Sequence, residues 1–199
     1  MSTTAKGSAF EQRVHDALAE ELKNERLCAS PKHATLHRRK SYHSRDRNAE
    51  IITDVSLEVF LPGKACPTLV WIFECKDYSG SIPVDDVEEF HSKLQQIGED
   101  NTKGTIVTNG ALQKGALAYA KSKKIGVIRL LPDDQVSHIM EFMTMQSLQR
   151  AQHIDWSEFP TALTNPDHQS RRGFFAASDN YHFGSWYSVL AHELSAKAT

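Results

Sequence analysis

Several features typical of membrane, secreted or disulfide-linked proteins are missing from this chain of 199 residues. No apolar run approaches the roughly 20 residues that a helix needs to cross a bilayer. The N-terminal stretch MSTTAKGSAF lacks the hydrophobic core of a secretory signal. The three cysteines, Cys28, Cys66 and Cys75, are widely spaced, so they predict neither a disulfide framework nor a CxxC metal pair. We therefore expect a cytoplasmic protein in a reducing compartment.

Motifs of several enzyme classes are also missing. The sequence has no glycine-rich phosphate loop and no GxSxG nucleophile elbow. Its ten histidines are scattered and include no HExxH pair, which argues against a zinc site. Repeats and low-complexity stretches are absent as well. With 40% hydrophobic and 24% charged residues, the composition is that of a soluble globular protein.

The charge of the chain is small overall but unevenly distributed. A net charge of −2 excludes a polycation. Within residues 32–47, however, six lysines and arginines stand against the single acid Asp46. Such a basic stretch favours a surface that faces phosphate, and a solvated charged loop is the alternative. The residues that we expect to approach a nucleic-acid backbone are Arg38, Arg39, Lys40, Arg45 and Arg47.

Hydrophobic periodicity predicts an α/β fold. An amphipathic helix is expected over residues 8–22, with Ser8 and Glu11 at the spacing of a capping box. Alternating and β-branched segments predict strands, and two of them are joined as a hairpin by LPGKACP. A strand–helix–strand unit that follows predicts a parallel pair. The expected strands cover residues 34–42, 49–60, 68–76, 103–110 and 125–131, and the later helices cover 85–97, 113–124 and 133–148.

The last quarter of the chain has a different composition. Eight of the 17 aromatic residues lie after residue 150. Disordered tails are poor in aromatics, so this segment is expected to pack on the core, on a second subunit or on another partner. We therefore divide the chain into a domain over residues 1–150 and an aromatic-rich C-terminal extension over residues 151–199.

The predicted strand in WIFECKDYSG, residues 71–80, ends in charged residues. Glu74 and Lys76 are two apart, so they lie on one face of the strand. If the hairpin turn centres near Lys64, Asp54 lies opposite Glu74. Opposed carboxylates repel unless a divalent cation lies between them, and their hard oxygen ligands suit Mg²⁺. The alternative is an exposed Glu74–Lys76 salt bridge at a strand end.

Asp54, followed by Glu74-Cys75-Lys76 on the next strand, resembles the PD-(D/E)xK nuclease signature. The order of elements resembles the restriction-endonuclease-like fold, a mixed central β-sheet flanked by α-helices. Residues 7–131, and residues 71–130 most specifically, are similar to the Mrr-like restriction endonuclease domain. The resemblance implies a Mg²⁺- or Mn²⁺-dependent DNA endonuclease, with restriction or phage defence as its setting. It makes residues 1–150 the nuclease domain.

The resemblance also implies roles for individual residues. Asp54, Glu74 and the backbone carbonyl of Cys75 would bind the metal, and Lys76 would be the catalytic lysine. Glu11 matches an acid on the first helix of the family, which can support a second metal. Its other interpretation is the capping-box partner described above.

Some positions stay open on sequence grounds. Thr53 precedes Asp54 where the signature has proline. Gln95 and Gln96 match a helix glutamine of some relatives, although helical projection places both off the apolar stripe and favours solvent exposure. Glu58 is either a satellite of the site or solvated, and Tyr78 either stacks on a nucleotide or packs.

Two other functions are compatible with the same residues. One is a non-catalytic nucleic-acid-binding module on this fold, against which the intact acids and lysine argue. The other is a nuclease subunit of a larger assembly, in which the C-terminal extension binds a partner subunit or a second copy of the chain.

Overall fold

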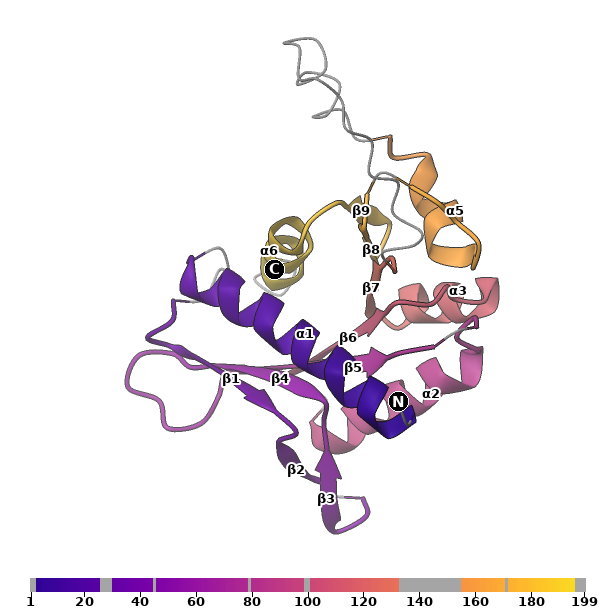
Figure 1. Cartoon of the computed structure of the whole chain (residues 1–199). Coiled ribbons are helices and arrows are strands. Elements are labelled where there is room, and N and C mark those ends of the chain that lie inside the picture. The colour runs from indigo at the N-terminus through magenta and orange to yellow at the C-terminus, as the bar shows by residue number, and fades with distance from the viewer. Residues whose placement is uncertain are drawn as a thin grey trace, which may run out of the picture.

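The computed structural model describes residues 3–25, 30–44, 46–78, 80–98, 101–132, 155–170 and 172–195 (Figure 1). The helices are α1 (Thr3–Lys23), α2 (Val84–Ile97), α3 (Lys114–Ser122), α5 (Glu158–Thr164) and α6 (Trp186–Ser195). The strands are β1 (Ala34–Arg38), β2 (Ser41–Ser44), β3 (Ala49–Ile52), β4 (Val55–Val59), β5 (Leu69–Lys76), β6 (Thr102–Thr108), β7 (Gly126–Leu130), β8 (Phe174–Ser178) and β9 (Tyr181–Phe183). In these residues, no helix is both long and apolar enough to span a membrane.

A seven-stranded mixed sheet forms the centre of the molecule. Its strand order is β1-β4-β5-β6-β7-β8-β9, and β2 pairs with β3 in a separate two-stranded sheet. β5 and β6 are parallel, as are β6 and β7, whereas the other neighbours are antiparallel. The predicted α/β architecture with a parallel strand–helix–strand unit is confirmed.

Helices cover both faces of the sheet (Figure 1). Side chains of a strand alternate between faces, and β5 is buried on both. Ile72 packs with residues of α2, α3 and α5 on one face. Trp71 and Phe73 pack with residues of α1 and α6 on the other. The middle of β5 is therefore packed on both faces, and this packing positions the polar end of the strand.

The β4–β5 hairpin has the predicted register. Val55 pairs with Phe73 and Val59 pairs with Leu69, which corresponds to a turn centred near Lys64. One step beyond the last ladder pair, the same register sets Asp54 against Glu74. The expectation drawn from the turn residues is thus confirmed.

Two predicted strands are each divided in the structure. The single strand expected over residues 49–60 is β3 and β4, which belong to different sheets. The strand expected over 34–42 is β1 and β2, separated at Arg39 with a φ of 54°. The Arg39 N–H donates to the Asp54 carbonyl and the Thr53 N–H donates to the Lys40 carbonyl. The alternation of apolar and polar residues continues through these bends, so the sequence pattern does not predict them.

The first helix begins earlier than predicted. α1 starts at Thr3, which places Ser8 and Glu11 inside the helix. Interior backbone N–H groups bond to the preceding turn, so the capping-box prediction for this pair is wrong. Glu11 has no capping role, and its side chain is free for other contacts.

The described part of the C-terminal extension joins the central sheet. β8 pairs antiparallel with β7, and Phe159 of α5 packs edge-on against Phe175. Buried Arg129 of β7 donates to carbonyls of Ala162 and Asn165, the latter at 2.8 Å. Backbone carbonyls and ring contacts therefore attach these residues to the core. The predicted helix over 133–148 and the boundary at residue 150 lie outside the described residues.

Candidate active site

Two acidic side chains meet where β5 ends and β4 begins. Glu74 lies near the end of β5 and is 6% exposed. Asp54 immediately precedes β4, and its Oδ2 accepts a hydrogen bond of 2.8 Å from the Cys75 N–H. A backbone hydrogen bond thus fixes Asp54 beside the strand that carries Glu74. This is the juxtaposition that the hairpin register predicts.

The electrostatics of Asp54 show how crowded these carboxylates are. Burial, followed by the negative charge of Glu74, raises the pKa of Asp54 from 3.8 to about 6. The hydrogen bond from Cys75 opposes this rise, and the charge of Glu11 adds to it. A carboxylate in this state is stabilised by any added positive charge.

Glu74 contacts two lysine side chains rather than one. Lys76 Nζ lies 3.4 Å from Glu74 Oε1, and Lys93 Nζ of α2 lies 2.9 Å from the same oxygen. The side chains of Glu74 and Lys76 are 8% and 16% exposed. The Glu74–Lys76 ion pair is therefore present, but it joins a buried carboxylate to a partly buried lysine and is not the exposed salt bridge of the alternative.

Lys93 was missed by sequence reasoning. Burial alone would lower its pKa, but the charges and hydrogen bonds of Glu74 and Glu89 together outweigh burial and raise the pKa, so the side chain is an ammonium. Its Nζ also lies 3.3 Å from Glu89 Oε1, one turn earlier on α2. That Glu–Lys spacing is common on exposed helix faces and indicates nothing more by itself.

Glu11 provides a third acid at this end of the sheet. Its side chain is 13% exposed, and its Oε2 lies 3.7 Å from Arg39 Nη1. That oxygen is buried and has no hydrogen-bond partner among the described residues. Glu11 also contributes to the raised pKa of Asp54. A buried carboxylate oxygen without a donor is a candidate for a cation or an ordered water.

These donors fit a hard divalent cation. In the described ranges, no three His, Cys, Asp or Glu side chains lie close enough together to hold an ion unaided. Mg²⁺ needs only one or two carboxylates, because waters and substrate phosphate complete its shell. Burial, followed by the charge of Asp54, raises the pKa of the Cys75 thiol well above its usual value. The thiol stays neutral, which leaves the backbone carbonyl as the only suitable donor of Cys75.

The residues of the predicted basic stretch differ in their exposure and in their side-chain partners. Arg39 is more than half exposed beside Glu11, and Arg38 Nη1 donates to Gln12 Oε1 of α1 at 2.5 Å. Arg47 is exposed, and Arg45 lies outside the described residues. Lys40 is different, because its ammonium donates to Glu58 inside the protein. Among the described residues of this stretch, Arg38, Arg39 and Arg47 are therefore more exposed than Lys40.

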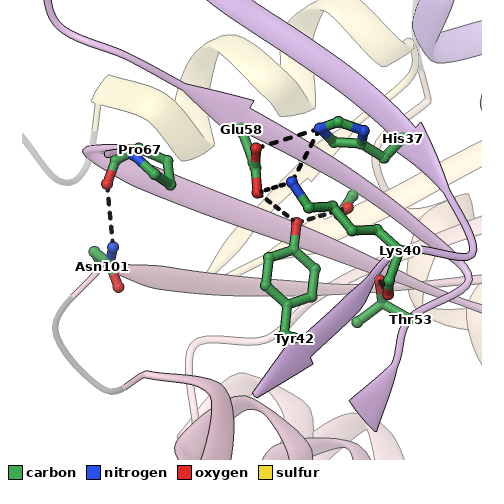
Figure 2. A network of polar contacts seen from close by, with 8 residues as sticks. His37, Lys40, Tyr42, Thr53, Glu58, Pro67 and Asn101 are labelled. Carbon is green, nitrogen blue, oxygen red and sulfur yellow. Dashed lines mark hydrogen bonds and ion pairs between the residues drawn. The ribbon is translucent and has the colours of Figure 1, made fainter. Parts of the chain in front are cut away.

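Figure 2 shows the network around Glu58, which is 6% exposed. Its carboxylate accepts hydrogen bonds from Lys40 at 2.6 Å and from the Tyr42 hydroxyl at 3.1 Å, and His37 Nε2 lies 3.2 Å away. Burial alone would raise the pKa of Glu58, but the hydrogen bonds from Lys40 and Tyr42 and the charges of Lys40 and His37 together outweigh burial and lower the pKa. Glu58 is thus not solvated, and its hydrogen-bond partners are separate from those of Glu74.

This network bears on the position of Asp54 through the backbone. The Lys40 carbonyl accepts hydrogen bonds from both the N–H and the hydroxyl of Thr53, at 2.9 and 3.1 Å. Thr53 directly precedes Asp54, so the bonds from Thr53 to Lys40, which is itself paired with Glu58, also restrain the backbone at Asp54. A threonine in place of the signature's proline keeps these two bonds, which proline could not make.

The other open positions are now placed. Gln95 is exposed as expected, but Gln96 is 8% exposed, accepts a hydrogen bond from Ser44 Oγ and donates one to Ser92 Oγ. The expectation of solvent exposure is wrong for Gln96, because β2 packs over it. Tyr78 is 40% exposed, so its ring does not pack in the core.

The mixed sheet with helices on both faces has the architecture of the restriction-endonuclease-like class. A family model described as "Restriction endonuclease" matches residues 4–140, which is more than half of the chain. The chain therefore belongs to this restriction endonuclease family, and the resemblance drawn from its motifs is confirmed.

Other comparisons are more distant. The crystal structure of a protein of unknown function, AF1548, is similar at 15% identity with a TM-score of 0.41. The similarity covers 56% of this chain and 54% of that one, so the chain spans about half the length of the protein it matches. No curated protein sequence matches the chain significantly.

Proposed function

We propose that this protein is a divalent-cation-dependent DNA endonuclease that hydrolyses phosphodiester bonds. The observation that carries the proposal is the register that sets Asp54 against Glu74, with Lys76 on the same face of β5. Asp54, Glu74 and the Cys75 carbonyl hold Mg²⁺ or Mn²⁺ in this proposal, and Glu11 supports a second ion.

The chemistry follows from the properties of these groups. A bound divalent cation polarises the phosphodiester and lowers the pKa of water. Lys76 lies beside the acids, where its ammonium orients a water molecule or offsets the negative charge that develops on the phosphate. The Cys75 N–H holds Asp54 in place, and the apolar contacts of Trp71 and Phe73 hold β5. Lys76 and the two acids thus have separate roles.

DNA is the substrate that the charge pattern supports. Arg38 is the last residue of β1, and Arg39, which follows it in the bend before β2, lies beside Glu11. Arginine pairs with phosphate oxygens in a bidentate way. We propose that Arg38, Arg39, Arg45 and Arg47 contact the DNA backbone. Lys40 contributes its charge to the same region from its position at Glu58.

Cleavage of supercoiled plasmid tests the proposal. Purified protein should relax or linearise plasmid with Mg²⁺ or Mn²⁺ and should be inactive with EDTA. Asp54→Asn and Glu74→Gln should both abolish cleavage while DNA binding, measured by fluorescence anisotropy, is retained or tightened. Binding without cation-dependent cleavage by the wild type would instead favour a non-catalytic nucleic-acid-binding module.

We also propose that the C-terminal extension contacts a second copy of the chain or a partner subunit, with restriction or phage defence as the setting. The support is that Trp156, Tyr181 and Tyr187 are 49%, 61% and 54% exposed, although β8 of the same extension pairs with β7 in the sheet. Sedimentation equilibrium of the wild type and of a variant with all three aromatics changed to serine tests this. A monomer at every concentration would exclude self-association.

A further inference from the structure

The Lys93 ammonium lies within ion-pair distance of two carboxylates. Its Nζ lies 2.9 Å from Glu74 Oε1 and 3.3 Å from Glu89 Oε1. The two partners differ in burial, because the Glu74 side chain is 8% exposed and the Glu89 side chain is 62% exposed. Lys93 itself is about a quarter exposed, with α2 as its backbone support. A small rotation of its side chain is enough to favour either partner.

The buried carboxylate needs a positive charge more than the exposed one does. An ionised group that is taken out of water is costly unless it is paired. In the structure, the nearest cation to Glu74 is the ammonium of Lys93, which is closer than that of Lys76. Lys93 therefore supplies charge compensation at the carboxylate that the proposed function assigns to a divalent cation.

A divalent cation bound to Glu74 would replace the Lys93–Glu74 ion pair and would repel the Lys93 ammonium. The cation would compensate the same carboxylate, and it would repel an ammonium a few ångströms away. Glu89 offers Lys93 a second partner at almost the same distance, on the adjacent turn of the same helix. Exchange of partners thus needs no backbone movement.

We propose that Lys93 is a positioning residue that holds Glu74 in the cation-free protein and yields it to the divalent cation by turning to Glu89. The inference rests on the proposed function, since it assumes that Glu74 is a cation ligand. It assigns to Lys93 a role distinct from that of Lys76: Lys93 sets the affinity for the cation and keeps Glu74 in place before the cation arrives.

Calorimetric titration of Mn²⁺ into the cation-free full chain tests the exchange. Lys93→Met should tighten Mn²⁺ binding by roughly tenfold, since a competing charge is removed, although the side chain is partly solvated. Glu89→Gln should act in the opposite direction and weaken binding a few-fold, because Lys93 loses its second partner. Lys93→Arg keeps the charge and should remain near the wild type. Lys64→Met, an exposed lysine in the β4–β5 turn, is the matched control and should change nothing.

Thermal unfolding supplies a second readout. In EDTA, Lys93→Met should unfold at a lower temperature than the wild type, because Glu74 loses its closest cation. It should gain more from added Mn²⁺ than the wild type does. If Lys93→Met fails to fold, the weaker Mn²⁺ binding expected of Glu89→Gln, set against the near-wild-type binding expected of Lys93→Arg, still decides the matter.

Failure of the inference and failure of the proposed function give different results. Unchanged or weaker Mn²⁺ binding by Lys93→Met, while Asp54→Asn abolishes binding, overturns the role of Lys93 alone. Unchanged binding by Glu89→Gln has the same meaning. The absence of any Asp54-dependent Mn²⁺ binding in the wild type overturns the proposed function and this inference with it.

Discussion

Replacement of Asp54 by asparagine should stabilise the cation-free protein at neutral pH. The change removes a carboxylate that burial and the charge of Glu74 disfavour, but it keeps an oxygen that accepts the hydrogen bond from the Cys75 N–H. The native pKa of Asp54 is about 6 against an ordinary value of 3.8. Since one pKa unit corresponds to about 1.4 kcal/mol, the free energy of unfolding should rise by at most about 3 kcal/mol.

The gain should depend on pH in a defined direction. A carboxyl group whose native pKa is raised binds its proton more tightly when folded, so its ionisation costs stability. This cost is absent below about pH 4, grows as the pH rises, and is complete above about pH 6. The difference between Asp54→Asn and the wild type should therefore be near zero at pH 4 and largest at pH 7.5.

Urea unfolding in EDTA at several pH values measures this difference. Asp46→Asn is a matched control, because Asp46 is exposed in the turn between β2 and β3. With Mn²⁺ added, the wild type should gain stability and Asp54→Asn should not. Equal differences at pH 4 and pH 7.5, or a less stable Asp54→Asn at pH 7.5, would refute the reasoning about these carboxylates.

Three further predictions concern the lysines and arginines around the site. Lys76→Ala should keep Mn²⁺ binding in calorimetry but lower the rate of plasmid cleavage by roughly 10²–10³, the loss expected for one stabiliser of developing charge; an unchanged rate would exclude a catalytic role. Joint neutralisation of Arg38, Arg39 and Arg47 should weaken binding of all DNA sequences and flatten its salt dependence by about 0.9 per lost contact, and an unchanged slope would place these residues away from DNA. Lys40→Met should lower the free energy of unfolding by about 1–3 kcal/mol in urea titration, since buried Glu58 loses its shortest bond, and Lys40→Met with Glu58→Gln should recover part of the loss.

Much of the site could be predicted from the sequence because the relevant patterns are local. The apolar run before Glu74 indicates a buried strand, and the Gly/Pro connection near Lys64 indicates a hairpin. These two features alone determine the register that sets Asp54 against Glu74. Lys76 follows on the same face from the two-residue period of a strand. Side-chain alternation and turn position are properties of a short segment, so the chain specifies them without reference to distant residues.

The rest depended on contacts between residues far apart in the sequence. From the sequence, Lys93 and Glu58 both have the pattern of solvated residues. In the structure, Lys93 of α2 contacts Glu74 of β5, and Glu58 accepts hydrogen bonds from Lys40 and Tyr42. Glu11 became available because α1 begins at Thr3, upstream of the apparent cap. Charge compensation of a buried carboxylate is decided by which side chains reach it, and that is a property of the tertiary structure. The sequence by itself determined that Asp54 and Glu74 lie opposite each other, and the folded chain decided which cations lie beside them.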